Sequence, residues 1–264
     1  PGQGHYINPD FITNQGDTTI KGYVTDIITD LVLEWFEKKR MKNKPFLMFY
    51  LHKAPHRPWW PSPEKFKEYS KKKFPIPKTL FDDYSNRGSA AKSAEMNILY
   101  DLRYGHDSKI KPSTIDNMEE IQPYVEPYDW GGLDGFTSSF MRCDQTQRDE
   151  YNIVLDSINL WFKNNWSSLD YKEKMIWKYQ RYMQDYLGCI SSVDDNIGRV
   201  LDYLNKSGLI ENTIVVYTSD QGFYLGEHGW FDKRFIYEES FKTPLMIRWP
   251  EKIKKGLIIN QMVQ

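Results

Sequence analysis

The chain has 264 residues, with 35 Lys and Arg against 36 Asp and Glu, so its formal net charge is −1. This balance argues against a protein that binds nucleic acid by neutralising phosphates, because such a surface needs a net or strongly clustered positive charge. Apolar residues make up 40% of the chain, which is enough for a sizeable core. No apolar run approaches the roughly 18–20 residues that cross a bilayer, so no membrane span is expected.

Three segments have the residue pattern of helices. Apolar residues at mostly helical spacing predict an amphipathic helix over residues 22–40. Ser62 followed by Pro63 is the usual start of a helix, and here predicts a short one. A much longer helical pattern runs from about Tyr171 to Asn205, and Ser207-Gly208 ends it.

Short apolar runs between these segments predict strands. Residues 45–51, 213–218 and 245–248 are continuously apolar or nearly so, as in strands buried on both faces of a parallel sheet. Because strands and helices alternate, we expect an α/β fold with a largely parallel sheet. Residues 74–165 lack a clear period and predict an irregular region laid over this scaffold, although 149–162 could be helical.

Polar residues with metal-binding and anion-binding chemistry follow the second predicted strand. Asp220 comes directly after residues 213–218, and Gln221 supplies an adjacent amide oxygen. Ligands of open α/β sheets bind beyond the carboxyl ends of the strands, and oxygen donors suit a hard cation such as calcium or magnesium. An imidazole, His228, and an ammonium, Lys233, follow in the same loop. Spacing alone also fits an ordinary turn, so both interpretations stay open.

A second candidate is His56, which lies between Pro55 and Pro58 in a turn whose backbone is rigid. Rigid placement suits a general acid, whose proton must reach the leaving group within hydrogen-bond distance. The alternative is a surface histidine held among prolines and tryptophans. Lys53 and Arg57 flank His56, and they could recognise additional anionic groups or be solvated charges.

Large aromatic side chains offer a further hypothesis. Trp59, Trp60 and Trp130 could stack on sugar rings. Tryptophans of this kind also pack in protein cores, so the sequence leaves both roles open.

Taken together, these motifs resemble the downstream half of the sulfatase family, in the alkaline phosphatase superfamily. The resemblance lies in Thr218–Lys233 and Tyr237–Pro250, in Lys53–Trp59, which is similar to the family's middle histidine motif, and in Val193–Arg199, similar to the helix before its metal-binding strand. It extends from about Gly22 to Gly256, except for the irregular middle. The resemblance implies an α/β, alkaline phosphatase-like fold with a mostly parallel central sheet flanked by helices, here incomplete.

The resemblance also implies roles for particular residues. Asp220 would be a carboxylate ligand of a divalent metal, Ca²⁺ with Mg²⁺ as the alternative, and Gln221 would occupy the next ligand position. Lys233 would contact the sulfate oxygens, and His56 would bind the sulfate or protonate the leaving alkoxide. His228 would bind substrate, unless a structural hydrogen bond explains it.

The nucleophile of the family has no match in this sequence. In sulfatases a Cys or Ser, within a motif that continues to Pro or Ala and then Arg, is converted to formylglycine. Cys143 is followed by Asp-Gln-Thr and Cys189 by Ile-Ser-Ser, and neither fits. We therefore expect residues 1–264 to be the downstream part of a sulfatase catalytic domain, a fragment inactive alone, with the formylglycine upstream.

The function that the resemblance implies is sulfuric ester hydrolysis, with a sulfated small molecule or glycan as substrate. A phosphonate monoester or phosphodiester hydrolase of the same superfamily is the first alternative. The second is a non-catalytic fragment that at most binds a partner. Family members are commonly exported, so a periplasmic or secreted location is expected, although the sequence contains no signal peptide.

Overall fold

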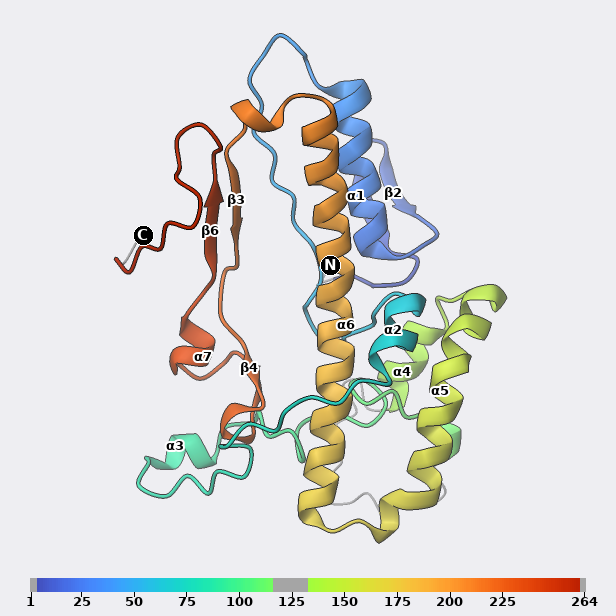
Figure 1. The fold of residues 1–264 in the computed structure, drawn as a ribbon. Helices are drawn as coiled ribbons and strands as arrows, with labels where there is room; N and C mark the ends of the chain where they lie inside the picture. Colours follow the sequence, from blue (N-terminus) through green and yellow to red (C-terminus); the bar gives the residue numbers. More distant parts are fainter. Residues whose placement is uncertain (1–3, 116–132, 262–264) are drawn as a thin grey trace.

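A computed structural model of the chain describes residues 4–115 and 133–261. The long helix α6 runs through the middle of the molecule, with α1, α2 and α5 on one side and the β3–β6 pair on the other (Figure 1). The helices are α1 (Val24–Glu34), α2 (Pro63–Tyr69), α3 (Ser89–Lys92), α4 (Leu133–Phe140), α5 (Gln145–Asn165), α6 (Tyr171–Lys206) and α7 (Glu238–Phe241). Shorter helical turns cover Trp35–Lys39, Pro112–Thr114, Trp166–Ser168, Ile210–Asn212 and Glu227–Gly229.

The strands form three antiparallel pairs in the described ranges. Their bounds are β1 (Asp10–Thr13), β2 (Gly16–Thr19), β3 (Val215–Thr218), β4 (Tyr224–Leu225), β5 (Phe231–Asp232) and β6 (Leu245–Arg248). Strand β1 pairs with β2, β3 with β6, and β4 with β5.

The predicted helices are confirmed, including the signals that begin and end them. The helix expected over residues 22–40 is α1, continued by a π-helical turn over Trp35–Lys39. Ser62 caps α2, because its side chain accepts a hydrogen bond from the backbone N–H of Lys65. Helix α6 ends where Gly208 adopts a left-handed conformation (φ 71°), which costs glycine little. No helix in the described ranges is both long enough and apolar enough to cross a membrane.

The region 74–165 is more regular than its composition indicates. Helix α5 has 21 residues and extends the segment 149–162 that could be helical in both directions. Asp144 caps it in a reciprocal arrangement with Gln147, three residues into the helix. This capping box is the sequence signal that marks the start of α5.

The parallel arrangement predicted for the strands is not found among the described residues. Residues 215–218 and 245–248 form β3 and β6, but both strands are mostly exposed rather than buried on both faces. Thr218 pairs with Leu245, so the two strands are antiparallel. The connection between the two strands contains the β4–β5 hairpin and α7. It begins and ends at the same end of the strand pair, so β6 runs in the direction opposite to β3.

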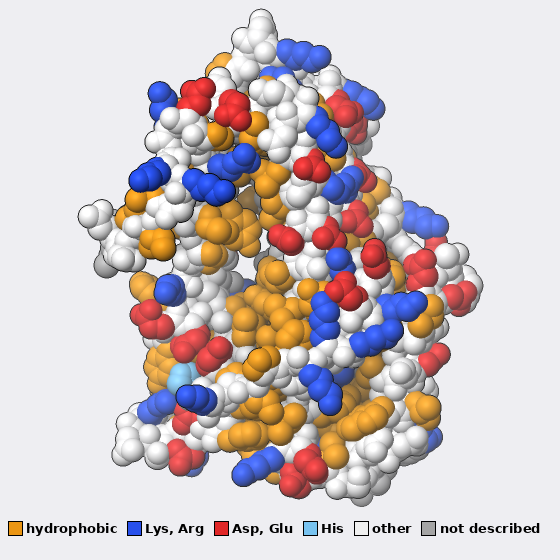
Figure 2. Space-filling view, in the orientation of Figure 1, with side chains coloured by type: hydrophobic (Ala, Val, Ile, Leu, Met, Phe, Trp, Pro, Cys, Tyr) orange, Lys and Arg blue, Asp and Glu red, His pale blue; other side chains and the backbone are white. Residues whose placement is uncertain are grey.

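The predicted strand at residues 45–51 is extended but pairs with no other described strand. Its side chains alternate in exposure: Phe46, Met48 and Tyr50 pack against the cluster between α1 and α6. Leu47, Phe49 and Leu51 are 79%, 75% and 73% exposed. Hydrophobic side chains gather on this part of the surface, between the β3–β6 pair and α6 (Figure 2). The prediction of burial on both faces is therefore wrong for the described chain, because only one face is covered.

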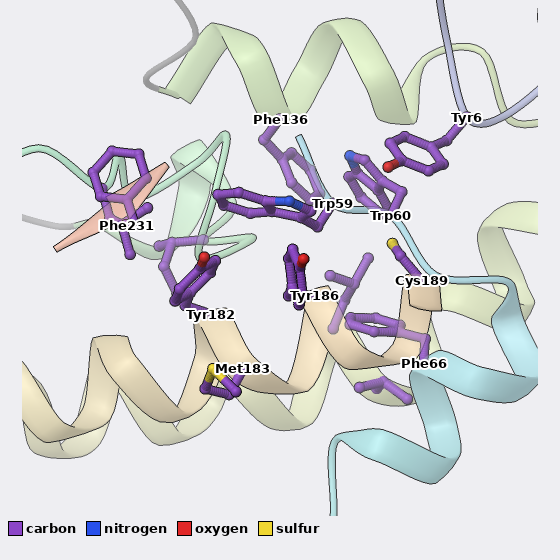
Figure 3. Packing of buried hydrophobic residues seen from close by; sticks show 14 of the residues in the cluster. Tyr6, Trp59, Trp60, Phe66, Phe136, Tyr182, Met183, Tyr186, Cys189 and Phe231 are labelled. Atoms are coloured by element: carbon purple, nitrogen blue, oxygen red, sulfur yellow. The ribbon is translucent and has the colours of Figure 1, made fainter. Parts of the chain in front are cut away.

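The main core lies between α6, α5, α2 and the loops that pack on them. Trp59 and Trp60 are 0% and 1% exposed, and the Trp59 ring lies 4.8 Å from that of Tyr182 (Figure 3). Both tryptophan rings are thus core residues, and the hypothesis that they stack on sugar rings is wrong. Trp130 lies outside the described residues.

Candidate active site

The loop after β3 carries two side chains with oxygen donors, Asp220 and Gln221, that make few hydrogen bonds within the described part of the chain. Asp220 is exposed, and its closest hydrogen-bond contact in the described part of the chain is Ser219 Oγ, at 3.5 Å from Oδ1. The side-chain amide of Gln221 makes no hydrogen bond to any described residue. Consecutive residues of this loop therefore carry a carboxylate and an amide oxygen that can coordinate a ligand.

Gly222 holds this loop against α7. Its N–H donates to the carbonyl oxygen of Ser240 at 2.9 Å. A Cβ on Gly222 would lie 2.2 Å from the carbonyl oxygen of Glu239, a distance that real Cβ atoms do not show. Only glycine allows the two backbones to approach this closely.

Lys233 directly follows β5, the second strand of the β4–β5 hairpin. Its carbonyl oxygen accepts a hydrogen bond of 2.7 Å from Ser240 Oγ, while the Ser240 carbonyl holds Gly222. Ser240 therefore connects the loop of Asp220 to the segment of Lys233. The sequence pattern does not single it out as a functional residue, although it lies within the matched segment Tyr237–Pro250.

His56 occupies a turn fixed by hydrogen bonds on both sides. Its N–H donates to the Lys53 carbonyl at 2.9 Å, and its own carbonyl accepts from the Tyr6 hydroxyl at 2.7 Å. The ring atom Nδ1 lies 2.7 Å from the carbonyl oxygen of Arg57. Because a carbonyl can only accept, Nδ1 carries the proton, and Nε2 is left to take up or deliver one.

Arg57 is neither a solvated charge nor a free anion receptor. Its Nε donates to Asp107 Oδ1 at 2.7 Å and its Nη2 pairs with Oδ2 of the same buried carboxylate. Although burial alone would raise the pKa of Asp107, the charges of Arg57 and His106 hold it well below its ordinary value. The guanidinium also lies 5.0 Å from the Phe231 ring centroid, so it joins the His56 turn to β5.

The charge of Lys233 acts on the ring of His56, whose turn is joined to β5 by Arg57. Burial lowers the pKa of His56 below its ordinary value, and the Arg57 carbonyl opposes this by favouring the protonated ring. The positive charges of Lys233 and Lys53 lower the pKa further. Lys233 therefore influences the protonation of His56, and Ser240 connects the Lys233 segment to the Asp220 loop.

His228 is held by hydrogen bonds to the segment 79–87. Its Nδ1 lies 2.8 Å from Asp82 Oδ2, which also pairs with Arg87 Nη2 at 2.8 Å. Its backbone N–H donates to Thr79 Oγ1 at 3.1 Å, and its carbonyl accepts from the Tyr84 hydroxyl at 2.6 Å. A structural hydrogen bond, the alternative to substrate binding, is therefore present, while a contact with substrate stays a prediction.

The donor set at Asp220 fits part of a calcium site. Within residues 4–115 and 133–261, no group of three or more His, Cys, Asp and Glu side chains could hold a metal. Calcium takes six to eight oxygen ligands, and Asp220 and Gln221 can supply two of the preferred kind. The chemistry of these donors therefore agrees with a hard cation, provided that other groups complete its shell.

The two cysteines do not fit the role of nucleophile. Both Cys143 and Cys189 are buried and free. Burial raises the pKa of the Cys143 thiol to about 11, and it raises that of Cys189 further. Both side chains are therefore neutral thiols at physiological pH, which are poor nucleophiles.

Comparison with known proteins gives a match over nearly the whole of this chain. It is 43% identical over 254 residues to N-acetylglucosamine-6-O-sulfatase of Bacteroides thetaiotaomicron, covering 96% of this chain and 43% of that relative. Choline-sulfatase of Rhizobium meliloti is 32% identical over 186 residues, which cover 63% of this chain and 36% of that protein.

A solved structure is similar to the structure of this chain over nearly the whole length of this chain. The structure of BT4656 in complex with its substrate D-glucosamine-2-N,6-O-disulfate matches with a TM-score of 0.82 and 43% identity, covering 96% of this chain and 48% of that one. This likeness and the mixed helices and strands confirm the α/β, alkaline phosphatase-like fold. The chain spans less than half the length of these relatives. The sequence profile of the sulfatase family matches residues 2–264, and the chain belongs to that family.

Proposed function

We propose that the protein containing this chain is a sulfuric ester hydrolase that removes sulfate from a sulfated carbohydrate of the 6-O-sulfated glucosamine class. The observation that carries the proposal is a series of contacts between the segments of the candidate residues. Arg57 joins the His56 turn to Phe231 in β5, two residues before Lys233, and Ser240 joins the Lys233 segment to the Asp220 loop. The names of the similar relative and of the solved complex support the substrate class.

Lys233 would contact the sulfate of the bound ester. Its ammonium lies 5.9 Å from the Phe223 ring centroid. A fixed positive charge beside a transferring anion can lower the barrier by several kcal/mol, because no solvent has to reorganise during the reaction. Removing this charge should therefore affect the chemical step more than substrate binding.

His56 would bind the sulfate or protonate the leaving alkoxide through Nε2. Its Nδ1–H is occupied by the Arg57 carbonyl, so a second proton must be bound at Nε2 before it can be delivered. Because the pKa of His56 is lowered, the protonated ring is lost as pH rises through a value below 6.5. If His56 is the acid, kcat/KM should fall with rising pH in that range, and His56→Ala should remove this limb.

Asp220 and Gln221 would hold the divalent cation, calcium with magnesium as the alternative. When bound, such a cation supplies positive charge against the sulfate oxygens. Calcium titration of the protein containing this chain tests this without turnover: Asp220→Asn should weaken binding at least tenfold. Asp202→Asn, at an exposed carboxylate on α6, should leave it unchanged. Equal affinities in all three proteins would contradict the assignment.

The nucleophile would be a formylglycine outside residues 1–264. Both cysteines of this chain are buried neutral thiols outside the family motif, and no other residue is proposed for the role. The chain by itself should therefore release no sulfate, which is also what a non-catalytic fragment would show. We further expect export to the periplasm or medium, as the family resemblance implies, and cell fractionation would check it.

Sulfate release measured by ion chromatography would test the activity, using the protein that contains this chain. D-glucosamine 6-O-sulfate and D-glucosamine-2-N,6-O-disulfate should be hydrolysed, with Lys233→Met at least a hundredfold slower. Lys252→Met, at an exposed lysine, is the matched control. Faster cleavage of a phosphonate monoester or phosphodiester than of any sulfate ester would instead favour the phosphorus chemistry.

A further inference from the structure

A cavity of about 140 Å³ lies beside the His56 turn and has a basic lining. The N-terminal segment, the 53–60 loop, His106 and the end of α4 bound it. Its polar side chains are four bases, three hydroxyls and one indole N–H: His5, Lys53, His106, Arg142, Tyr6, Ser138, Ser139 and Trp60. A water molecule takes about 30 Å³ of liquid, so the cavity can hold a group of several non-hydrogen atoms. No carboxylate is among its described lining residues.

Two of the four bases already have carboxylate partners. Arg142 pairs with Asp10 at 2.8 Å, and His106 Nδ1 lies 3.1 Å from Asp107 Oδ1. Burial lowers the pKa of both His5 and His106, so these rings are largely neutral at pH 7. Of these four bases, Lys53 is the charged one that has no carboxylate partner in the described ranges.

The Lys53 ammonium is buried, and among the described residues its Nζ finds no hydrogen-bond acceptor. It lies over the Tyr6 ring, whose centroid is 4.8 Å away. Burial lowers the pKa of Lys53 to about 8, so most of the population is still protonated at pH 7. A buried ammonium without an acceptor destabilises the fold, unless a bound anion pairs with it.

A second donor in the same lining also lacks an acceptor. Trp60 is 1% exposed, and its Nε1–H is unpaired in the part of the chain that the structure describes. The neighbouring Trp59, by contrast, donates its Nε1–H to the Pro55 carbonyl at 2.7 Å. In Figure 3 the nitrogen of Trp60 lies at the edge of its ring that faces α4, next to Tyr6. Two buried N–H donors of the cavity therefore have no acceptor among the described residues. A ligand with acceptor oxygens would pair with both.

The cavity is tied directly to the candidate acid. Tyr6, in its wall, donates its hydroxyl proton to the His56 carbonyl at 2.7 Å, and the Lys53 carbonyl accepts from His56 N–H at 2.9 Å. One turn of four residues therefore carries both the basic cavity wall and His56.

We propose that this cavity, through Lys53 and Trp60, binds a second sulfate group of the substrate, beside the ester that is cleaved. The inference rests on the proposed function, and it assigns the recognition of a disulfated sugar to residues outside the catalytic set. A free inorganic anion has the same chemistry, so the two sources have to be separated by experiment.

The first experiment compares kcat/KM on D-glucosamine-2-N,6-O-disulfate with that on D-glucosamine 6-O-sulfate, in the protein containing this chain. Lys53→Met should lower the ratio of the two about tenfold, because a charge-assisted hydrogen bond to the second sulfate is lost. Lys53→Arg should keep most of the preference. Lys71→Met, at an exposed lysine outside the cavity lining, should keep all of it. An unchanged ratio in Lys53→Met would overturn the proposal.

The second experiment measures binding by calorimetry and does not depend on turnover. Glucosamine-2-N-sulfate, which lacks the ester to be cleaved, should bind the wild-type protein and bind Lys53→Met about tenfold more weakly. If neither sulfate ester is hydrolysed but this difference holds, the proposed function fails and the anion site stands. Wild-type binding of inorganic sulfate at Lys53, without any binding of glucosamine-2-N-sulfate, would assign the cavity to a free anion and overturn the proposal.

Thermal unfolding separates recognition from a structural role of the ammonium. Removing an unpaired buried charge should leave the unfolding temperature of Lys53→Met equal to that of wild type or higher. A lower unfolding temperature, with equal loss on both substrates, would mean that the contact with Tyr6 is what Lys53 provides, and would overturn the proposal.

Discussion

Replacing Gly222 with alanine tests whether the loop of Asp220 and Gln221 is held against α7. A Cβ at this position would lie 2.2 Å from the Glu239 carbonyl oxygen and 2.7 Å from that of Lys242. An ordinary carbon–oxygen contact is about 3.3 Å, so the two backbones would have to separate by about 1 Å. Because both obstacles are backbone atoms, no change of side-chain rotamer relieves the clash.

Gly222→Ala should destabilise the chain by about 2–4 kcal/mol. Overpacking of this kind costs about 1–3 kcal/mol. The same displacement stretches the hydrogen bond from Gly222 N–H to the Ser240 carbonyl, which contributes about 1 kcal/mol more. For a domain of this size each kcal/mol lowers Tm by about 2–4 °C, so we expect a drop of roughly 5–15 °C in differential scanning calorimetry. Calcium titration should show weaker binding as well, because Asp220 and Gln221 move with the loop.

Gly198→Ala is the matched control for this experiment. Gly198 lies inside α6, and a Cβ there would meet nothing within 4 Å. Alanine should therefore stabilise the helix by about 0.5–1 kcal/mol, since glycine loses more backbone entropy on folding. If Gly222→Ala unfolded within about 1 °C of wild type while the control behaved as expected, the close approach of loop and α7 would be refuted.

Three further substitutions test other parts of the fold. His228→Ala removes the 2.8 Å bond to Asp82 and should cost about 1.5–3 kcal/mol in urea unfolding; no loss would contradict its fastening role. Lys178 is fully buried with a pKa lowered to about 7. Between pH 7 and 9 the unfolded chain holds a proton there that the folded chain has lost, so wild-type stability should rise with pH and Lys178→Met should lack this rise. Asp170→Ala removes the capping box of α6 and should cost about 1 kcal/mol, read as a drop in Tm; an unchanged Tm would mean that the cap contributes nothing.

The predictable part of the site is the part encoded within short stretches of sequence. Asp220 and Gln221 could be proposed because they follow a strand-like run, and Lys233 because it lies further along the same recognisable string. The position of Ser240 between them could not, because its two hydrogen bonds join residues 7 and 18 positions away through folding of the loop. Residue type and spacing identify the chemistry, whereas the contacts that assemble it depend on tertiary structure.

The role of Arg57 shows the same limit for charged residues. From sequence it is a cation beside His56, equally suited to an anionic ligand or to solvent. In the structure its partner is Asp107, 50 positions away and 2% exposed. Nothing in the local pattern distinguishes a residue that pairs with a buried carboxylate from one, such as Lys53, that finds no acceptor among the described residues.

The prediction for segment 45–51 is wrong for a different reason. Its continuous run of apolar residues predicts burial on both faces, whereas the described chain covers only one face. Phe46, Met48 and Tyr50 find that cover on α1 and α6, so the prediction holds for one face. On the other face the three large apolar side chains of Leu47, Phe49 and Leu51 remain at least 73% exposed. Burying each of these side chains would stabilise the fold by about 1.5–3 kcal/mol. Leaving all three exposed therefore forgoes about 5–9 kcal/mol of folding free energy, which is comparable to the net stability of a whole domain. Polar residues at positions 47, 49 and 51 would avoid this loss of folding free energy, but the sequence has Leu, Phe and Leu there. The continuous apolar run therefore predicts a second covering layer, one that the described residues do not provide.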